Sequence, residues 1–303
     1  MKISICIPTY NRPEFLKQAI YSSINQSFPP VEILIGDDSI NNESKILVKR
    51  IQKKTKINIR YFKNSPSLGQ ADNVNSLINK VIGDKLILLH DDDLLMEDAL
   101  QNMKACFEID PEINAVYGKQ YIIDEDGIID QRQTKNLNKY FFRTEFYEKI
   151  RLSSLEAGVV QQFPNDGYLI NSEIAQKVGY RRKEDIGNAG DFDFGFRLGL
   201  YGYKLHFLNE FTAKYRMTTS SVARNGTDSG YQAFKIITEH LSNKKILSSK
   251  TIIEIMKRKA PIAIMQAIKK GRKKEALRIY FGIYHRNRIL SLGGFKRFLH
   301  LLK

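Results

Sequence analysis

The first hundred residues alternate between short apolar runs and longer stretches in which apolar residues recur at helical spacing. Apolar runs predict four strands, at 3–8, 31–36, 57–62 and 85–90. Amphipathic stretches predict three helices, at 13–24, 42–54 and 74–81. Strand and helix thus alternate in units of about 25 to 30 residues, which is typical of βαβ crossovers. We expect an α/β fold with a doubly wound, mainly parallel sheet covered on both faces.

The pattern changes in the second part of the chain. Asp126-Gly127 lies between two isoleucine pairs, and this dipeptide is strongly associated with tight turns, so we predict a hairpin over 116–132. Residues 140–182 mix aromatic and polar positions, and we interpret them as strands and loops that cover a site. From about Tyr231 the pattern is helical again.

Composition places the chain among ordinary globular proteins. Its 303 residues are 42% hydrophobic and 27% charged, which suits a large core. No stretch approaches the roughly 18 uninterrupted apolar residues of a membrane-spanning helix, and Tyr10-Asn11-Arg12 interrupt the first apolar run too early for a secretory signal, so we expect a cytosolic protein. Cys6 and Cys106 lie far apart in apolar settings, which favours buried, reduced thiols and excludes a cysteine-based zinc site.

The net charge of +15 belongs to the C-terminal part of the chain. Residues 241–303 contain 17 of the 48 basic residues but, among acids, only Glu254 and Glu275, so the preceding part is electrically neutral. The cations alternate with apolar residues in basic amphipathic helices, which we expect to be interrupted at Pro261, Gly271 and Gly293-Gly294. Such helices either bind an anionic membrane surface or pack on the body of the protein or a second subunit. Nucleic acid is a weaker candidate, because no binding motif accompanies the charge.

Polar residues follow three of the predicted strands. Thr9-Tyr10 follows the first, Asp37-Asp38 the second and Asp91-Asp92-Asp93 the fourth. Ligands of open parallel sheets bind beyond the carboxyl ends of the strands, so we expect these residues to line one edge. No G-x-G-x-x-G follows the first strand and the chain has no P-loop motif, so phosphate must be bound in another way.

The acidic triplet, Asp91–Asp93, supports two interpretations. Adjacent carboxylates at the end of an apolar strand repel one another, and a hard divalent cation such as Mg²⁺ or Mn²⁺ would compensate them and bind substrate phosphates. The alternative is a solvated acidic turn before a helix that starts near Glu97. The position of the triplet at the predicted edge, opposite Asp37-Asp38, favours the cation site.

Four segments carry a family resemblance. They are Ile5-Cys6-Ile7-Pro8-Thr9-Tyr10-Asn11-Arg12, Gly36-Asp37-Asp38-Ser39, Leu89-His90-Asp91-Asp92-Asp93 and Ala189-Gly190-Asp191-Phe192-Asp193-Phe194-Gly195-Phe196-Arg197-Leu198. In this order and approximate spacing they resemble motifs of the family-two inverting glycosyltransferases of the GT-A fold, and Tyr215-Arg216 resembles the strand that follows in that family. The resemblance covers roughly residues 1–225.

The resemblance implies an organisation and an activity. A GT-A domain would occupy 1–230, with a nucleotide-sugar-binding half at 1–118 and an acceptor half at 119–230, before a basic helical extension at 231–303. The enzyme would use Mg²⁺ or Mn²⁺ to move a sugar from a nucleotide-diphospho-sugar, in our prediction a UDP-sugar, to an acceptor hydroxyl with inversion. Its acceptor would be a saccharide or lipid-linked saccharide in surface polysaccharide or glycoconjugate biosynthesis, which would make it a peripheral enzyme at the inner face of the cell membrane. A homo-oligomer is a further expected form.

The resemblance also implies a role for each candidate residue. The nucleotide-binding set is Pro8, Thr9, Tyr10, Arg12, Asp38, Asp91 and Asp92, in which Thr9 and Asp38 hold the base and Asp91 holds the ribose. Asp92 and Asp93 would bind the metal that bridges the diphosphate. Asp191 would be the general base that takes the proton of the acceptor hydroxyl.

Departures from the family pattern and a second hypothesis accompany these assignments. Gly190 occupies a position that is commonly Glu, and Thr218 one where many members have a metal-site His, so we expect looser or water-completed metal coordination. Without the resemblance, Asp191 would be interpreted as a solvated acid. The alternative function is a non-catalytic nucleotide- or polyanion-binding module that depends on the basic tail. Deleting 241–303 would then abolish ligand binding, whereas the enzyme hypothesis predicts that nucleotide binding persists.

Overall fold

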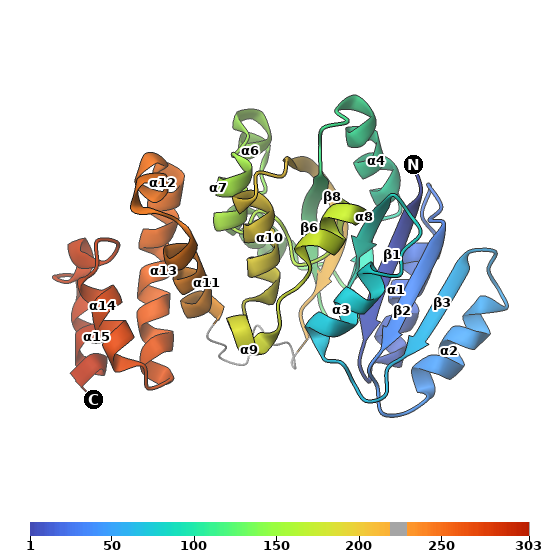
Figure 1. Cartoon of the computed structure of the whole chain (residues 1–303), viewed down its shortest axis with the longest axis horizontal. Coiled ribbons are helices and arrows are strands. Elements are labelled where there is room, and N and C mark those ends of the chain that lie inside the picture. The colour runs from blue at the N-terminus through green and yellow to red at the C-terminus, as the bar shows by residue number, and fades with distance from the viewer. Residues whose placement is uncertain (219–228, 303) are drawn as a thin grey trace. The chain divides into compact units, whose positions relative to one another are not determined.

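The computed structural model describes residues 1–218 and 229–302 (Figure 1). They form two compact units: residues 1–180 with 194–218, and residues 181–193 with the described residues from Ser229 onward. The strands are β1 (Ile3–Thr9), β2 (Glu32–Asp37), β3 (Asn58–Lys63), β4 (Lys85–Leu88), β5 (Leu94–Leu95), β6 (Ala115–Ile123), β7 (Tyr168–Asn171) and β8 (Leu205–Arg216). The helices are α1 (Pro13–Ile24), α2 (Glu43–Gln52), α3 (Gln70–Ile78), α4 (Ala99–Ile109), α5 (Gln131–Tyr140), α6 (Glu145–Ile150), α7 (Ser154–Val159), α8 (Ser172–Val178), α9 (Lys183–Ile186), α10 (Gly190–Leu200), α11 (Ser229–His240), α12 (Asn243–Ser248), α13 (Lys250–Lys269), α14 (Lys273–Phe281) and α15 (Leu292–Leu302), with a 3₁₀ turn at Arg286–Arg288.

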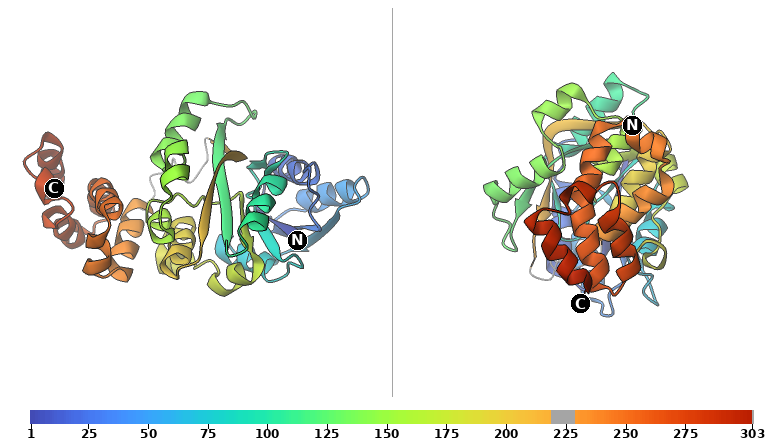
Figure 2. Two further views of the ribbon diagram at one scale, coloured as in Figure 1. Left: turned by 90° about the horizontal axis from the view of Figure 1, so that it is seen from above. Right: turned by 90° about the vertical axis from the view of Figure 1, so that its left-hand side faces the viewer.

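The first unit is built on one mixed sheet, in the order β3-β2-β1-β4-β7-β6-β8-β5. β1 lies between β2 and β4 and is parallel to both, so that Cys6 lies beside Leu34 and Leu88. β7 runs antiparallel to β4 and β6, while β6 and β8 run side by side in parallel (Figure 2). The expected α/β fold with a mainly parallel central sheet is therefore confirmed.

Alternation along the central strands divides the core of this unit into two layers. Ile5 and Ile33 join a cluster with α1, α2 and α4, whereas Cys6 and Leu34 join a second cluster with α3, α8 and the later part of α10. In Figure 1, α3 and α8 lie in front of the sheet. Burial on both faces explains why these strands are almost uninterrupted apolar runs. Cys6 and Cys106 are free and buried, as predicted.

The elements predicted in the first hundred residues are present, with small shifts at their ends. The largest shift concerns α3, which was expected at 74–81 but begins at Gln70. The preceding Gly69 has a φ of +79°, which glycine adopts without strain, and its N–H donates to Asp38 at 2.9 Å. A loop anchored on Asp38 therefore sets where the helix starts.

The predicted hairpin over 116–132 is wrong beyond its turn. Gly127 does occupy the turn at a φ of +86°, but the returning segment makes a single bridge, Ile123 to Ile129, before α5 begins. α5 supplies side chains to β6 in place of a partner strand: Thr134 accepts from Ile122 N–H at 2.9 Å, and Asn138 bonds both backbone groups of Gln120 at 3.2 and 2.9 Å. These two polar residues satisfy backbone groups that a returning strand would have paired.

The interpretation of residues 140–182 as strands and loops is also wrong. The segment contains α6, α7 and α8, and only β7 is a strand. α7 begins with a capping box in which Ser153 and Glu156 satisfy each other's backbone N–H groups. That Ser-x-x-Glu spacing is a helix-start signal, which the aromatic and polar pattern around it obscured.

The described part of the second unit from Ser229 onward consists of helices, as expected from Tyr231 onward. α13 packs between α11 and α14 and also contacts α15 (Figure 2). The expected break at Gly271 is confirmed, since α13 ends at Lys269 and Gly271 follows with a φ of +71°. The breaks expected at Pro261 and at Gly293-Gly294 are wrong, because Pro261 lies inside α13 and both glycines lie in the first turn of α15. Within residues 1–218 and 229–302, no helix combines the length and apolarity that crossing a bilayer requires.

Candidate active site

The carboxyl ends of β1 and β4 meet through hydrogen bonds between their following loops. Thr9 Oγ1 donates to Asp91 Oδ2 at 2.7 Å, and the Tyr10 N–H donates to the same oxygen at 3.3 Å. Arg12 Nη1 lies 2.5 Å from Asp92 Oδ2 and 3.5 Å from Asp91 Oδ1. Pro8 is the penultimate residue of β1 and pairs in register with Gly36. Residues predicted to line one edge therefore touch one another.

The end of β2 joins the same edge. The Asp38 N–H donates to Thr9 O at 3.0 Å, which places the second loop beside the first. The Asp38 carboxylate accepts from Asn64 Nδ2 at 2.8 Å and from the backbone N–H groups of Leu68 and Gly69 at 3.1 and 2.9 Å. Asp37 is fully buried and bonds Tyr61 and Lys63 of β3. Asp37 thus links β2 to the neighbouring strand β3, while Asp38 fixes the loop before α3.

His90, Asp92 and Asp93 form a cluster able to bind a metal ion. One ligand atom from each lies within 4.8 Å of the others. Asp93 is buried; its Oδ1 accepts from Arg216 N–H at 2.7 Å, and its Oδ2 has no hydrogen-bond partner among the described residues. A buried carboxylate oxygen without a donor, next to an imidazole and a second carboxylate, fits a divalent cation that takes oxygen and nitrogen ligands.

Burial and mutual repulsion raise the pKa values in this acidic turn. Burial, followed by the charge of Asp92, raises the pKa of Asp91 to about 6, against the opposing effects of Thr9 and Arg12. The pKa of Asp93 is raised well above its ordinary value by burial and by the carboxylates of Asp166 and Asp92. The raised pKa values show that the carboxylates of this turn repel one another, so a positive charge placed among them would be strongly stabilised.

Asp166 is a site residue that sequence reasoning missed. Its side chain is fully buried; Oδ2 accepts from the His90 N–H at 3.0 Å and Oδ1 accepts from Gln120 Nε2 at 3.2 Å. Gln120 Oε1 in turn accepts from Arg143 Nη1 at 2.7 Å. Burial lowers the pKa of Arg143 to about 10, and the charge of Asp166 opposes this shift. A buried polar chain thus connects α5 and the loop after it to the acidic turn at Asp91–Asp93.

Arg216, at the end of β8, closes the other side of the acidic turn. Its Nε donates to Asp92 O at 2.8 Å, and its Nη1 donates to the carbonyl oxygens of Asp124 and Glu125 at 2.9 and 2.8 Å. The guanidinium lies 4.8 Å from the centroid of the Phe15 ring. Its many partners explain why so large a cation is buried, and its N–H bond to Asp93 fixes that carboxylate.

The predicted base, Asp191, lies in the first turn of α10 and belongs to the second unit. It is partly exposed, whereas Asp193 is fully buried and makes a two-point ion pair with Arg181, whose Nε lies 2.9 Å from Asp193 Oδ2. Asp193 therefore stabilises the start of the helix. Phe192, the next residue along the chain, is buried, and the Lys259 ammonium lies 5.0 Å from its ring centroid.

Lys259 provides a test of how this segment packs. Burial lowers its pKa from 10.5 to about 8, so between these values the unfolded chain binds more protons than the folded one and stability increases with pH. We expect the stability difference between wild type and Lys259→Met to shift in favour of wild type by up to about 2 kcal/mol between about pH 7 and about pH 9.5. Urea unfolding at both pH values measures the effect. Equal slopes for the two chains would show that the ammonium is hydrated instead.

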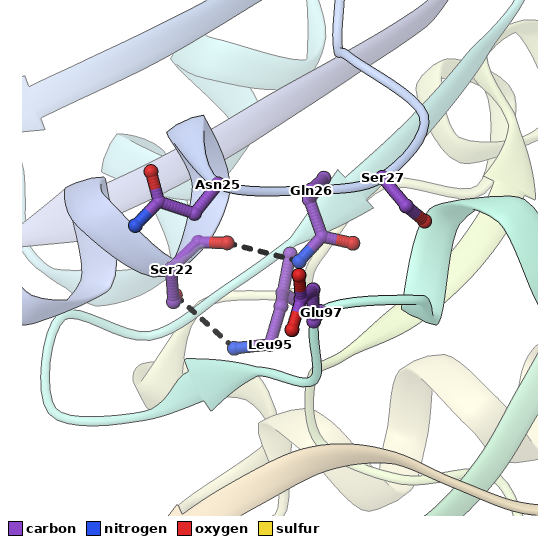
Figure 3. Close-up of a pocket in the computed structure, with 6 residues that line it drawn as sticks. All are labelled: Ser22, Asn25, Gln26, Ser27, Leu95 and Glu97. Carbon is purple, nitrogen blue, oxygen red and sulfur yellow. Dashed lines mark hydrogen bonds between the residues drawn. The ribbon is translucent and has the colours of Figure 1, made fainter.

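A hollow of about 560 Å³ lies away from these residues, between the end of α1 and the segment after β5 (Figure 3). Two of its lining side chains are already hydrogen-bonded: Ser22 Oγ accepts from Leu95 N–H at 3.2 Å, and Gln26 Nε2 donates to Ser22 O at 2.9 Å. Because these groups are already paired, we assign the hollow no ligand.

Comparisons with known proteins define the family. Residues 4–159 match the family model described as glycosyl transferase family 2, and residues 85–261 match glycosyl transferase family group 2. The chain therefore belongs to glycosyl transferase family 2 and is a transferase enzyme. Membership in a family of enzymes argues against the alternative of a non-catalytic polyanion-binding module.

Individual relatives cover different parts of the chain. An uncharacterized glycosyltransferase of Methanocaldococcus jannaschii, MJ1057, is 27% identical over 253 residues, which are 80% of this chain and 80% of the relative. The GalNAc(5)-diNAcBac-PP-undecaprenol beta-1,3-glucosyltransferase of Campylobacter jejuni is 31% identical over 139 residues, which are 46% of this chain and 44% of the relative.

Solved structures share the fold at low sequence identity. S. aureus TarS 1-349 in complex with UDP-GlcNAc matches with a TM-score of 0.62 and 16% identity, over 100% of this chain and 80% of that chain. The mannosyltransferase PcManGT from Pyrobaculum calidifontis, in complex with GDP-Man and Mn²⁺, matches with a TM-score of 0.60 and 14% identity, over 99% and 87%. These likenesses confirm a GT-A-type fold.

Proposed function

We propose that the enzyme is a metal-dependent, inverting glycosyltransferase that uses a UDP-sugar. The observation that carries this proposal is the meeting of Thr9, Arg12 and the Asp91–Asp93 turn at the carboxyl edge of β1 and β4. Open parallel sheets bind ligands at this edge. The complexes of TarS with UDP-GlcNAc and of PcManGT with GDP-Man and Mn²⁺, which share the fold, support a nucleotide-sugar donor and a divalent cation.

The nucleoside would lie between the loops after β1 and β2. Thr9 and Asp38 would contact the base, and Asp91 the ribose, with Pro8 and Tyr10 forming the edge of the site. Asp38 keeps its carboxylate fixed through three N–H donors, so little side-chain entropy remains to be lost on binding. Arg12, which pairs with Asp91 and Asp92, would bring positive charge near the diphosphate.

His90, Asp92 and Asp93 would hold Mg²⁺ or Mn²⁺. When bound, the cation would neutralise charge that develops on the departing diphosphate. His90 is an addition to the ligands expected from sequence, and it offers the imidazole that Thr218 does not. Asp166 would position this group of ligands, since it holds the His90 backbone.

Asp191 would accept the proton of the acceptor hydroxyl as that oxygen attacks the anomeric carbon. Attack from the face opposite the diphosphate forms the new carbon–oxygen bond as the bond to the diphosphate breaks, and the configuration inverts. We propose a lipid-linked saccharide as acceptor, because the named Campylobacter relative acts on an undecaprenol-linked saccharide. Such an acceptor would place the enzyme at the inner surface of the cell membrane.

A thermal-shift panel tests the donor and the cation together. UDP and UDP-sugars with Mn²⁺ are expected to stabilise the folded chain by about 2.7 kcal/mol at a hundredfold excess over Kd, and EDTA to remove most of this gain. GDP- and CDP-sugars at the same concentration are the matched controls. A stronger response to GDP would refute the UDP assignment, and a response unaffected by EDTA would refute metal dependence. Proton NMR of the product's anomeric coupling tests inversion.

A further inference from the structure

α15 presents apolar residues on two adjacent faces, one buried and one exposed. Its inner face packs within the second unit: Tyr280 Oη donates to Gly294 O at 3.2 Å, and the Tyr280 and Phe298 ring centroids lie 5.9 Å apart. Leu301, on the same face, is 6% exposed. These contacts with α14, together with those to α13, fix the orientation of α15. The second, exposed apolar face of α15 therefore has a fixed position on the surface of the unit.

The outer face is an exposed apolar stripe. Leu292, Phe295, Leu299 and Leu302 are 85%, 59%, 45% and 68% exposed. Their spacing of three, four and three residues puts them along one side of the helix. The stripe continues into the preceding turn at Leu290, which is 99% exposed. A row of exposed apolar residues of this kind marks an interaction surface.

The surroundings of the stripe carry positive charge. Arg286, Arg288 and Lys296 are exposed, and the sequence contains no acidic residue after Glu275. A second copy of this face would bring like charges together, which opposes a symmetric dimer through it. A partner with an apolar interior and an anionic surface complements both properties at once.

We propose that the outer face of α15, with the turn at 286–290, docks on an anionic lipid bilayer. At 11 residues, α15 would be about 16 Å long, which is too short to span the roughly 30 Å hydrocarbon core. It would lie in the plane of the interface, with the stripe among the acyl chains and the cations at the headgroups.

This inference deepens and rests on the proposed function, for which a membrane-bound acceptor is required. The compact unit that contains α15 also contains residues 181–193, which include Asp191. Docking this unit on a bilayer would therefore bring the unit that carries the proposed base to the membrane that contains a lipid-linked acceptor. The surface would serve to concentrate the acceptor at the enzyme.

The test is co-sedimentation of the full chain with vesicles of phosphatidylcholine that contain about a third phosphatidylglycerol, or none. Wild type is expected to bind the anionic vesicles at least about tenfold more tightly than the neutral ones, and less tightly as salt is raised. Replacing Leu292, Phe295, Leu299 and Leu302 by Ser should weaken binding at least about tenfold. Arg286→Gln, Arg288→Gln and Lys296→Gln together should remove the preference for anionic lipid.

The matched control replaces Ile82 and Ile109, exposed apolar residues of the first unit, by Ser and should bind vesicles like wild type. Circular dichroism confirms folding of each variant. The inference is overturned if the stripe variant binds vesicles normally, if neutral vesicles bind equally well, or if light scattering shows that the stripe instead mediates a dimer. UDP binding, measured on the same samples, distinguishes failure of the docking inference from failure of the proposed function. If wild type binds vesicles but not UDP, the result counts against the proposed function alone.

Discussion

Asp191→Asn is expected to lower the rate of sugar transfer by about a thousandfold, the usual range for removing a general base, while UDP-sugar binding changes little. Asparagine keeps the size and hydrogen-bonding shape of the side chain but cannot accept the proton of the acceptor hydroxyl. Single-turnover transfer and calorimetric UDP binding separate the two effects. A fall in rate together with intact binding is the signature of an interaction needed in the transition state.

Asp185→Asn is the matched control, because Asp185 is an exposed acid of the same segment. It should transfer sugar at the wild-type rate. Asp193→Asn provides a contrast, since loss of the ion pair with Arg181 should lower the melting temperature as well as the rate. Transfer by Asp191→Asn at more than about a tenth of the wild-type rate would assign the base to another residue.

The sheet formed by the first hundred residues was predictable because its central strands are buried on both faces. Runs such as Lys85–Leu88 have no polar alternation, and few structures other than a central parallel strand accommodate them. The segment from α5 to α9 was harder to predict, because its short helices are fixed by distant contacts. α5 is a polar helix in which Thr134 and Asn138 form hydrogen bonds with the backbone of β6. The spacing of apolar residues in the sequence does not reveal such contacts.

The candidate site divides in the same way. Thr9, Asp38 and the acidic triplet each follow a strand end, so a topological rule located them. His90 could have been predicted as a ligand, since it directly precedes the triplet and an imidazole binds divalent cations, but only the carboxylates were predicted to bind the metal. Asp166 carried none: it is a buried acid in a segment without clear periodicity, brought to His90 and the acidic turn by the antiparallel pairing of β7 with β4.

Asp93→Asn is expected to change stability and metal binding in opposite directions. Asn keeps an oxygen to accept from Arg216 and gains an amide that can donate to Asp166, so without metal the variant should be more stable by about 1 kcal/mol or more. Its affinity for Mn²⁺, and the Mn²⁺-dependent part of UDP-sugar binding, should fall at least about a hundredfold, since a ligand is lost. Thermal melts with and without Mn²⁺ measure both.

The pH dependence gives the sign of the stability effect independently. Because the pKa of Asp93 is raised on folding, the folded chain binds more protons than the unfolded one, and metal-free wild type should lose stability as pH rises through the range between the two pKa values. Asp93→Asn should lack this loss, whereas Asp98→Asn, an exposed acid nearby, should behave as wild type. If Asp93→Asn responds to Mn²⁺ like wild type, the carboxylate is not a ligand; if it melts lower without metal, the repulsion inferred from its burial beside Asp166 is wrong.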